Sequence, residues 1–191
     1  MVTMDTAIFQ YFQNHIQTTM NVGEQCAESL IKATNQLVGA LLDGNTIYSC
    51  GHGLTAPLSK LLVSYLTLGH EIERPSFPAI DLESILSTYD NSDEAYAKLL
   101  DLHGKSGDAL VVFSGGSNNP TLEQAIVTAV RKGMLIVLLS AADDDLLTEQ
   151  IGGNGIEIST AEFGKSSTIS AGFLVLQCLC ALIDNKIFGG E

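Results

Sequence analysis

One stretch of the chain, residues 108–134, combines a short apolar run, a polar loop and a helical pattern, in that order. The apolar run at 109–113 has the length and β-branched content of a buried strand. Pro120 suits the first turn of a helix, where no backbone donor is needed, and Gly133 suits the position just after its end. Strand, loop and helix in succession predict one unit of an α/β fold with a parallel sheet.

The polar loop at residues 114–119, Ser-Gly-Gly-Ser-Asn-Asn, is the first candidate for a functional site. Free backbone N–H groups and hydroxyls at the positive end of a helix suit a phosphate or another anion. Glycine, serine and asparagine also make up ordinary loops between a strand and a helix. From this loop alone, an anion site and a plain connection both remain open.

The same alternation extends over most of the chain. Further strands are predicted at 46–50, 79–82, 135–139 and 155–159, and further helices at 57–68, 93–102 and 143–150. This order predicts a five-stranded parallel sheet with helices on both faces. A second glycine turn, residues 51–55, follows the first of these strands, and ligands of such sheets bind beyond the carboxyl ends of the strands. Since both glycine turns lie at that edge, the sequence favours a shared anion pocket there.

The chain carries more apolar helix than one small sheet needs. A first helix is predicted at 5–20, with its apolar face formed by Ile8, Phe9, Phe12 and Ile16. A second amphipathic helix is predicted at 23–43, and a long apolar helix at 167–185. The extra helices could cover an edge of the sheet or pack against another subunit. Their combined apolar faces exceed what the sheet can bury, which leads us to expect a tetramer.

Length and charge limit the class of protein. A chain of 191 residues, 46% of them hydrophobic, is one domain that can bury a full core. Its formal net charge of −13 disfavours direct contact with nucleic acid or anionic lipid. No uninterrupted apolar run reaches the ~18 residues of a membrane span. The start lacks the basic segment of a signal peptide, so a cytoplasmic protein is expected.

The residues that commonly bind metals are scattered. The cysteines are Cys26, Cys50, Cys178 and Cys180, and the histidines are His15, His52, His70 and His103. Neither set has metal-ligand spacing, so we expect buried free thiols and no metal site. Three aspartates at 143–145 are better explained by the positive end of a helix, which they stabilise.

Three motifs resemble a known family: residues 50–55 (Cys-Gly-His-Gly-Leu-Thr), 73–80 (Glu-Arg-Pro-Ser-Phe-Pro-Ala-Ile) and 113–118 (Phe-Ser-Gly-Gly-Ser-Asn). Through them the chain is similar, over nearly its whole length, to SIS (sugar isomerase) domains. The resemblance implies a three-layer, flavodoxin-like sandwich around a five-stranded parallel sheet, and a homotetramer. We therefore expect a single domain over 1–191, with a helical oligomerisation segment at 1–44 and the α/β core with the last helix at 45–188.

The resemblance also implies a sugar-phosphate pocket at the strand ends. Thr55 and Ser114 fall where the family places phosphate-binding hydroxyls, and Asn118 keeps the family's residue. The other pocket residues predicted from the same two loops are Gly53, Gly115, Gly116 and Ser117. The isomerases of the family carry more hydroxyls in the second loop. In this chain, backbone N–H groups would therefore supply most of the hydrogen bonds to a phosphate. No cofactor is expected.

Two positions depart from the isomerase pattern in a way that bears on catalysis. Moving a proton between neighbouring sugar carbons needs a base and an acid, and the isomerases use a glutamate and a histidine. Tyr65 and Gly172 stand at those positions in this chain. Glycine transfers no proton, and a tyrosine with a pKa near 10 is a poor base at neutral pH. We therefore predict no catalytic residue. Leu61 replaces a histidine that some members use to bind zinc.

The resemblance is closest to the branch that holds phosphoheptose isomerases and the DiaA proteins, which associate with the replication initiator DnaA. Residues 94–98 and 178–188 are most similar to DiaA. The resemblance implies a non-catalytic tetrameric scaffold for a DnaA-like initiator, with Ile187 and Phe188 on the partner surface. Two alternatives remain open. One is a phosphoheptose isomerase that converts sedoheptulose 7-phosphate to glycero-manno-heptose 7-phosphate. The other is a phosphosugar sensor without turnover.

Overall fold

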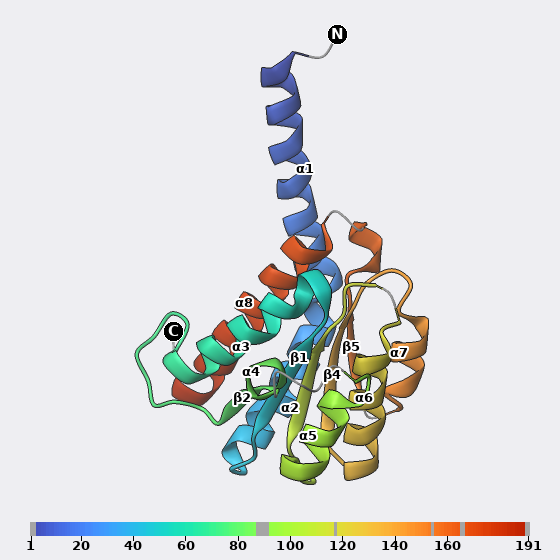
Figure 1. The fold of residues 1–191 in the computed structure, drawn as a ribbon. Coiled ribbons are helices and arrows are strands. Elements are labelled where there is room, and N and C mark those ends of the chain that lie inside the picture. Colours follow the sequence, from blue (N-terminus) through green and yellow to red (C-terminus); the bar gives the residue numbers. More distant parts are fainter. Residues whose placement is uncertain (1–2, 87–91, 117, 154, 165–166, 190–191) are drawn as a thin grey trace.

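A five-stranded parallel sheet forms the centre of the fold. The computed structural model describes residues 3–86, 92–116, 118–153, 155–164 and 167–189. The strands follow the order β2-β1-β3-β4-β5, and every neighbouring pair is parallel (Figure 1). Their bounds are β1 (Ile47–Gly51), β2 (Ala79–Asp81), β3 (Ala109–Phe113), β4 (Leu135–Ser140) and β5 (Ile156–Ser159). The predicted α/β class is confirmed.

Helices cover both faces of this sheet. The first face packs against α1 (Met4–Gln25), α2 (Ala27–Leu42), α3 (Ala56–Leu68) and α8 (Thr168–Phe188). The second packs against α4 (Leu82–Ile85), α5 (Ala95–His103), α6 (Pro120–Lys132) and α7 (Asp145–Gln150). Side chains alternate along a strand, so β3 sends Val111 and Phe113 into the first core and Leu110 and Val112 into the second. Burial on both faces explains why this strand is apolar throughout.

The ends of α6 follow the predicted signals. The side-chain oxygen of Asn119 accepts hydrogen bonds from the backbone N–H groups of Thr121 (3.0 Å) and Leu122 (3.2 Å), and Pro120 is the first helical residue. Gly133 follows the helix with a φ of 69°, the left-handed conformation that glycine adopts without strain. The positions of Pro120 and Gly133 were predicted correctly, whereas the cap formed by Asn119 was not predicted.

The first two helices differ from their predicted bounds. α1 continues to Gln25 instead of ending near residue 20, and α2 begins at Ala27. The prediction separated them around Gly23. A single glycine costs a helix only about 1 kcal/mol, so α1 runs through it and breaks at Cys26.

A short helix, α4, was missed. The strand predicted at 79–82 ends at Asp81. One carboxylate oxygen of Asp81 accepts a hydrogen bond from the backbone N–H of Ser84 at 3.1 Å and so caps the single turn that follows. An aspartate directly after an apolar pair was the available signal.

The first turns of α1 stand away from the body of the molecule (Figure 1). α1 is packed only near its end, where Val22 is buried. The apolar residues predicted for one face, Ile8, Phe9, Phe12 and Ile16, are each more than half exposed. The described part of the chain therefore leaves this face uncovered. The use of residues 1–44 for oligomerisation stays a prediction.

α8 is the most apolar helix. By length and composition it could cross a membrane. Here it lies along the first face of the sheet, where it buries Val175, Leu176, Leu179, Cys180 and Ile183 in the core. This packing explains its apolar character without a membrane.

All four cysteines are free, but only three are buried. Cys26, Cys50 and Cys180 lie in the core, whereas Cys178 is exposed, which corrects the expectation that all four are buried. Burial raises the pKa of the Cys180 thiol to about 12 and that of Cys50 further. Both are therefore protonated, and weak nucleophiles, at neutral pH.

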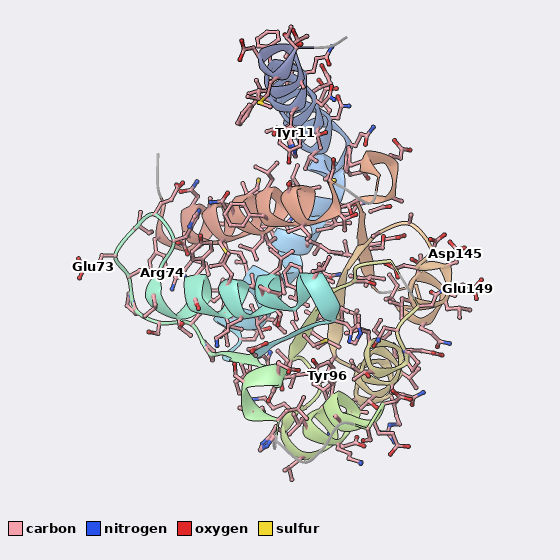
Figure 2. The ribbon with its side chains drawn as sticks, turned by 45° about the horizontal axis from the view of Figure 1, so that its top comes forward. Tyr11, Glu73, Arg74, Tyr96, Asp145 and Glu149 are labelled. Atoms are coloured by element: carbon pink, nitrogen blue, oxygen red, sulfur yellow. The ribbon has the colours of Figure 1, made fainter. Side chains whose placement is uncertain are left out.

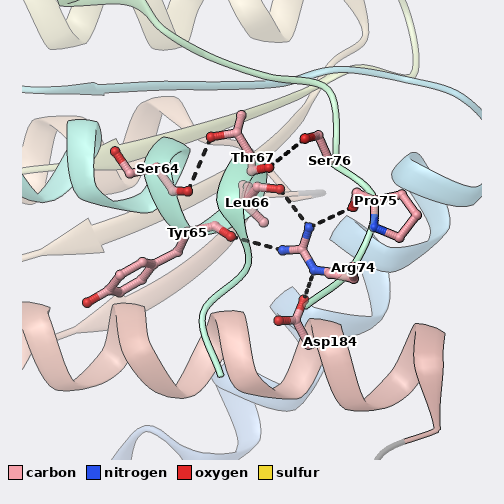
Figure 3. A network of polar contacts seen from close by, with 8 residues as sticks. All are labelled: Ser64, Tyr65, Leu66, Thr67, Arg74, Pro75, Ser76 and Asp184. Atoms are coloured by element: carbon pink, nitrogen blue, oxygen red, sulfur yellow. Dashed lines mark hydrogen bonds and ion pairs between the residues drawn. The ribbon is translucent and has the colours of Figure 1, made fainter. Parts of the chain in front are cut away.

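A buried ion pair joins the end of α3 to the end of α8 (Figure 3). The Arg74 Nε atom lies 2.6 Å from a carboxylate oxygen of Asp184, and the two side chains are 1% and 4% exposed. The other guanidinium nitrogens donate to the carbonyls of Tyr65 (2.9 Å), Leu66 (2.8 Å) and Pro75 (3.0 Å). Arg74 thus adds a second donor to two carbonyls in the last turn of α3, which also accept the backbone N–H groups of Gly69 and Phe77.

We predict that Asp184→Ala lowers the free energy of unfolding by about 3–5 kcal/mol, because it leaves the Arg74 charge buried without a counter-ion. Asp101→Ala is the matched control. Asp101 pairs with Arg131 at the same N–O distance, 2.6 Å, but these side chains are 52% and 63% exposed. Asp101→Ala should lower the free energy of unfolding by less than about 1 kcal/mol. Urea unfolding at one protein concentration measures both. Equal losses would contradict the importance of the buried pair.

Candidate functional site

The two glycine turns lie side by side at the carboxyl edge of the sheet. β1 and β3 are neighbours, and their last residues, Gly51 and Phe113, are paired in register. The turns that follow therefore start together. A Cβ atom on Gly115 would lie 3.7 Å from the Thr55 side chain, an ordinary contact distance. The expected meeting of the two turns is confirmed, while their use as an anion pocket stays a prediction.

The hydroxyl of Thr55 braces this meeting point. Thr55 is buried, and its Oγ1 lies 2.8 Å from the carbonyl of Phe113 and 2.9 Å from that of His52. A phosphate oxygen would need the one hydroxyl proton that these carbonyls share. His52, Gly53 and Leu54 are exposed on the same turn, so a ligand would first meet their backbone.

The second turn bends tightly against the loop after β4. The backbone N–H of Ser114 donates to the carbonyl of Leu139 at 2.9 Å, and the Ser114 hydroxyl accepts from the N–H of Gly116 at 3.4 Å. Gly116 has a φ of 82°, and a Cβ there would lie 2.2 Å from the Ala142 carbonyl. Only glycine fits this position.

A carboxylate is built into the far side of the second turn. Asp144 is buried and accepts hydrogen bonds from the backbone N–H groups of Ala141 (2.8 Å) and Asn118 (3.3 Å). Asn118, at a φ of 45°, accepts in turn from the N–H of Leu146 at 3.1 Å. Asp144 therefore stabilises the loop between β4 and α7 and joins it to the second turn. The sequence had suggested only that the aspartates at 143–145 stabilise the start of a helix. The negative charge of Asp144 also opposes a bound anion nearby.

Of the predicted pocket residues, Gly53, Thr55, Ser114, Gly115, Gly116 and Asn118 are described, whereas Ser117 lies outside the described residues. Several polar groups of the second turn already have partners within the chain, and Asn119 satisfies the first N–H groups of α6. The turns are thus well ordered by their own contacts. Sugar-phosphate binding by these residues stays a prediction.

The two positions that the isomerases use for acid and base lie apart in this chain. Tyr65 is in the last turn of α3, where its ring packs on His70 with 4.3 Å between the ring centres. Gly172 is buried in α8, and a Cβ there would lie 2.9 Å from a methyl of Leu58. Leu58 is two helical turns before Tyr65, or about 10 Å along α3. A larger side chain at 172 would have to displace Leu58.

A polar cluster around the buried Asp81 was missed. Asp81 accepts from the hydroxyls of Ser59 (2.6 Å) and Ser84 (2.5 Å). These residues come from β2, α3 and α4, so no spacing in the sequence indicates that they meet. The cluster positions the start of α3 against β2.

Tyr96 holds the end of β1. Its ring is buried, and its hydroxyl lies 2.6 Å from a Glu83 carboxylate oxygen and 3.2 Å from the Gly51 carbonyl. Burial, and then the hydrogen bond to Glu83, raise the pKa of Tyr96 far above its usual value. The hydroxyl is therefore a permanent donor and supports the first glycine turn.

The predicted partner residues close α8. Ile187 is half-buried against the first core, while Phe188, the last helical residue, is 43% exposed. The Phe188 ring is stacked on Phe77, with 5.8 Å between the ring centres and 27° between the planes. Their part in binding a partner stays a prediction. Among the described residues, no group of three or more histidine, cysteine or acidic side chains is placed to hold a metal ion.

Relatives of known sequence cover almost the whole chain. A family model described as the SIS domain matches residues 10–141. The DnaA initiator-associating protein DiaA of Shigella flexneri serotype 5b is 32% identical over 191 residues, 97% of each chain. The DiaA protein of Yersinia enterocolitica serotype O:8 is 33% identical over 183 residues, 93% of each chain.

Solved structures agree on the fold. A phosphoheptose isomerase from Francisella tularensis superposes with a TM-score of 0.84 at 24% identity, over 96% of this chain and 99% of that one. Phosphoheptose isomerase GmhA from Neisseria gonorrhoeae gives a TM-score of 0.84 at 18% identity, over 96% and 100%. With the family model covering more than half of its length, and with full-length relatives above 30% identity, the chain belongs to the SIS domain family.

Proposed function

We propose that this chain is a non-catalytic SIS protein that associates with a DnaA-type replication initiator and acts as a tetrameric scaffold. One observation carries the proposal. The chain aligns from end to end with DnaA initiator-associating proteins, at 32% identity over 97% of both chains. The formal charge of −13 disfavours direct contact with DNA, which fits a protein that acts through a DNA-binding partner.

The absence of catalysis is supported by the residues at the acid and base positions. Tyr65 is packed on His70 at the end of α3, and Gly172 carries no side chain. The long helix α8 offers no other proton donor of the same kind, because the chain has no histidine after His103. The glycine turns of the fold are kept, but the groups that would move protons are not.

The tetramer is supported by the uncovered apolar face of α1. Burying a large apolar side chain stabilises an assembly by about 1.5–3 kcal/mol, and Phe9, Phe12 and Ile16 offer three of them. A tetramer presents four copies of one binding surface. Several weak contacts then act together, which raises the affinity for a partner that is itself present in many copies.

The partner surface is proposed at the end of α8. Ile187 and Phe188 close this helix, and Phe188 remains 43% exposed although it is aromatic. Exposed aromatic anchors of this kind carry much of the energy in protein interfaces.

A phosphosugar sensor without turnover is the second candidate. It is favoured by the meeting of Thr55 and Gly115 at the carboxyl edge of the sheet, the position where such folds bind ligands. It is disfavoured by the buried Asp144 carboxylate on the second turn. A phosphoheptose isomerase, the third candidate, needs proton-transfer groups that Tyr65 and Gly172 do not supply.

We predict no turnover of sedoheptulose 7-phosphate above background. A general acid and a general base each contribute about 10²–10⁴-fold, and both are replaced. Purified protein is assayed for isomerisation, and a calorimetric titration with the same compound is run in parallel. Binding without turnover would support the sensor. Saturable turnover that Tyr65→Phe abolishes would contradict the non-catalytic proposal.

We predict a tetramer at micromolar concentration that depends on the apolar face of α1. Phe12→Glu should shift the protein toward smaller species, because a carboxylate would be buried in the contact. Asn14→Glu, which adds the same charge on the opposite side of α1, is the control and should leave the tetramer intact. Sedimentation velocity measures both. A stable monomer for the unmodified chain would contradict the scaffold.

We predict that Phe188→Ala weakens binding to the cognate DnaA-type initiator by roughly tenfold, the loss expected for one anchor of about 1.5 kcal/mol. The control is Leu102→Ala, which removes an exposed apolar side chain at the end of α5. Surface plasmon resonance on immobilised initiator gives the affinities, and light scattering checks the tetramer. An unchanged affinity, or a loss seen only when the tetramer dissociates, would count against this surface.

A further inference from the structure

Two aromatic rings from distant parts of the sequence meet at the chain's carboxyl end. Phe77 lies on the segment between α3 and β2, and Phe188 is the last residue of α8. Their rings are stacked at 5.8 Å with an interplanar angle of 27°. Figure 1 shows this segment passing beside the end of α8, where the C-terminus is marked. The pair therefore forms one surface built from two elements.

The buried ion pair joins the two elements that carry these rings. The guanidinium carbon of Arg74 lies 4.0 Å from the centre of the Phe77 ring, within the range of a cation–π contact. Arg74 is fixed by Asp184, and Asp184 precedes Phe188 by four residues on α8, so both point to the same side of that helix. Phe77 thus contacts both Arg74 and Phe188, and Phe188 lies one helical turn after Asp184. The ion pair therefore helps to hold the segment of Phe77 against the end of α8.

The surroundings indicate what kind of group could dock. Phe77 is half-buried, Phe188 is 43% exposed, and the positive charge of Arg74 is neutralised beneath the rings. Glu71 and Glu73 are exposed on the same segment. Figure 2 shows Glu73 on the outer side of the segment, while Arg74 turns toward the helices. Two exposed carboxylates, of which that of Glu71 lies 3.9 Å from His70 Nε2, flank this apolar surface, which suits an apolar side chain with basic neighbours.

We infer that Phe77 and Phe188 act together as a two-ring platform that receives an apolar side chain of the DnaA-type initiator, flanked on the initiator by basic groups. This inference rests on the proposed function. It extends the partner surface from the end of α8 to the segment between α3 and β2. It also gives Arg74 and Asp184 a role in positioning the platform, in addition to their role in stability.

A double-mutant cycle on the full-length protein tests the platform. The variants are Phe77→Leu, Phe188→Leu and the double substitution, each of which keeps an apolar side chain but removes a ring. Phe173→Leu is the matched control, because Phe173 is on α8 and is 36% exposed. Affinity for the immobilised initiator is measured together with tetramer size and melting temperature, so that a loss of folding is distinguished from a loss of docking.

We expect each single substitution to weaken binding by about two- to tenfold, the range of an aromatic contact. The double variant should bind the initiator only slightly more weakly than the weaker-binding single variant does, because the two rings act as one unit. The control should bind as the unmodified chain does.

Three results would overturn the inference. If Phe77→Leu lowers the melting temperature but leaves the affinity unchanged, while Phe188→Leu weakens binding, Phe77 is structural only and the proposed partner surface stands. If the losses of binding free energy in the two single variants add up to the loss in the double variant, the rings make two independent contacts and not one platform. If the unmodified chain does not bind the initiator at all, the proposed function fails, and the platform fails with it.

Discussion

The buried pair of Arg74 and Asp184 joins parts of the fold that are distant in sequence. Arg74 closes the last turn of α3 through the carbonyls of Tyr65 and Leu66, and Asp184 fixes the last turns of α8. The segment that leads into β2 is held between them. Two charges inside a protein are tolerated only when each has partners, so this region accepts little change in geometry. That constraint makes the end of α8 a rigid support for the exposed ring of Phe188.

The central part of the fold could be predicted because its signals are local. The apolar run of β3, Pro120 in the first turn of α6 and Gly133 after its end each act within a few residues, and the structure agrees with all of them. The meeting of the two glycine turns followed from strand order alone. By contrast, the contacts of Asp81 and Tyr96 join separate strands and helices, and no spacing indicates them.

The residues at family positions in the glycine turns also hold the loops in shape. Thr55, Ser114 and Asn118 stand at family positions, yet each is also bonded to the chain's own backbone. Those bonds keep the turns in shape whatever lies between them. Residues inherited with a binding site can thus be retained for loop geometry alone, which is why resemblance in these motifs says more about the fold than about ligand binding.

In the tetramer that we propose, α1 would link the folded state of the protein to its concentration. A helix of 22 residues whose apolar face meets only water has little beyond its own hydrogen bonds to hold it, and isolated helices are marginal under those conditions. Dilution that separates subunits would therefore unwind α1 as well as release it. Refolding of α1 adds an entropic cost to reassembly. The assembled fraction would therefore need a higher protein concentration than the contact area alone suggests.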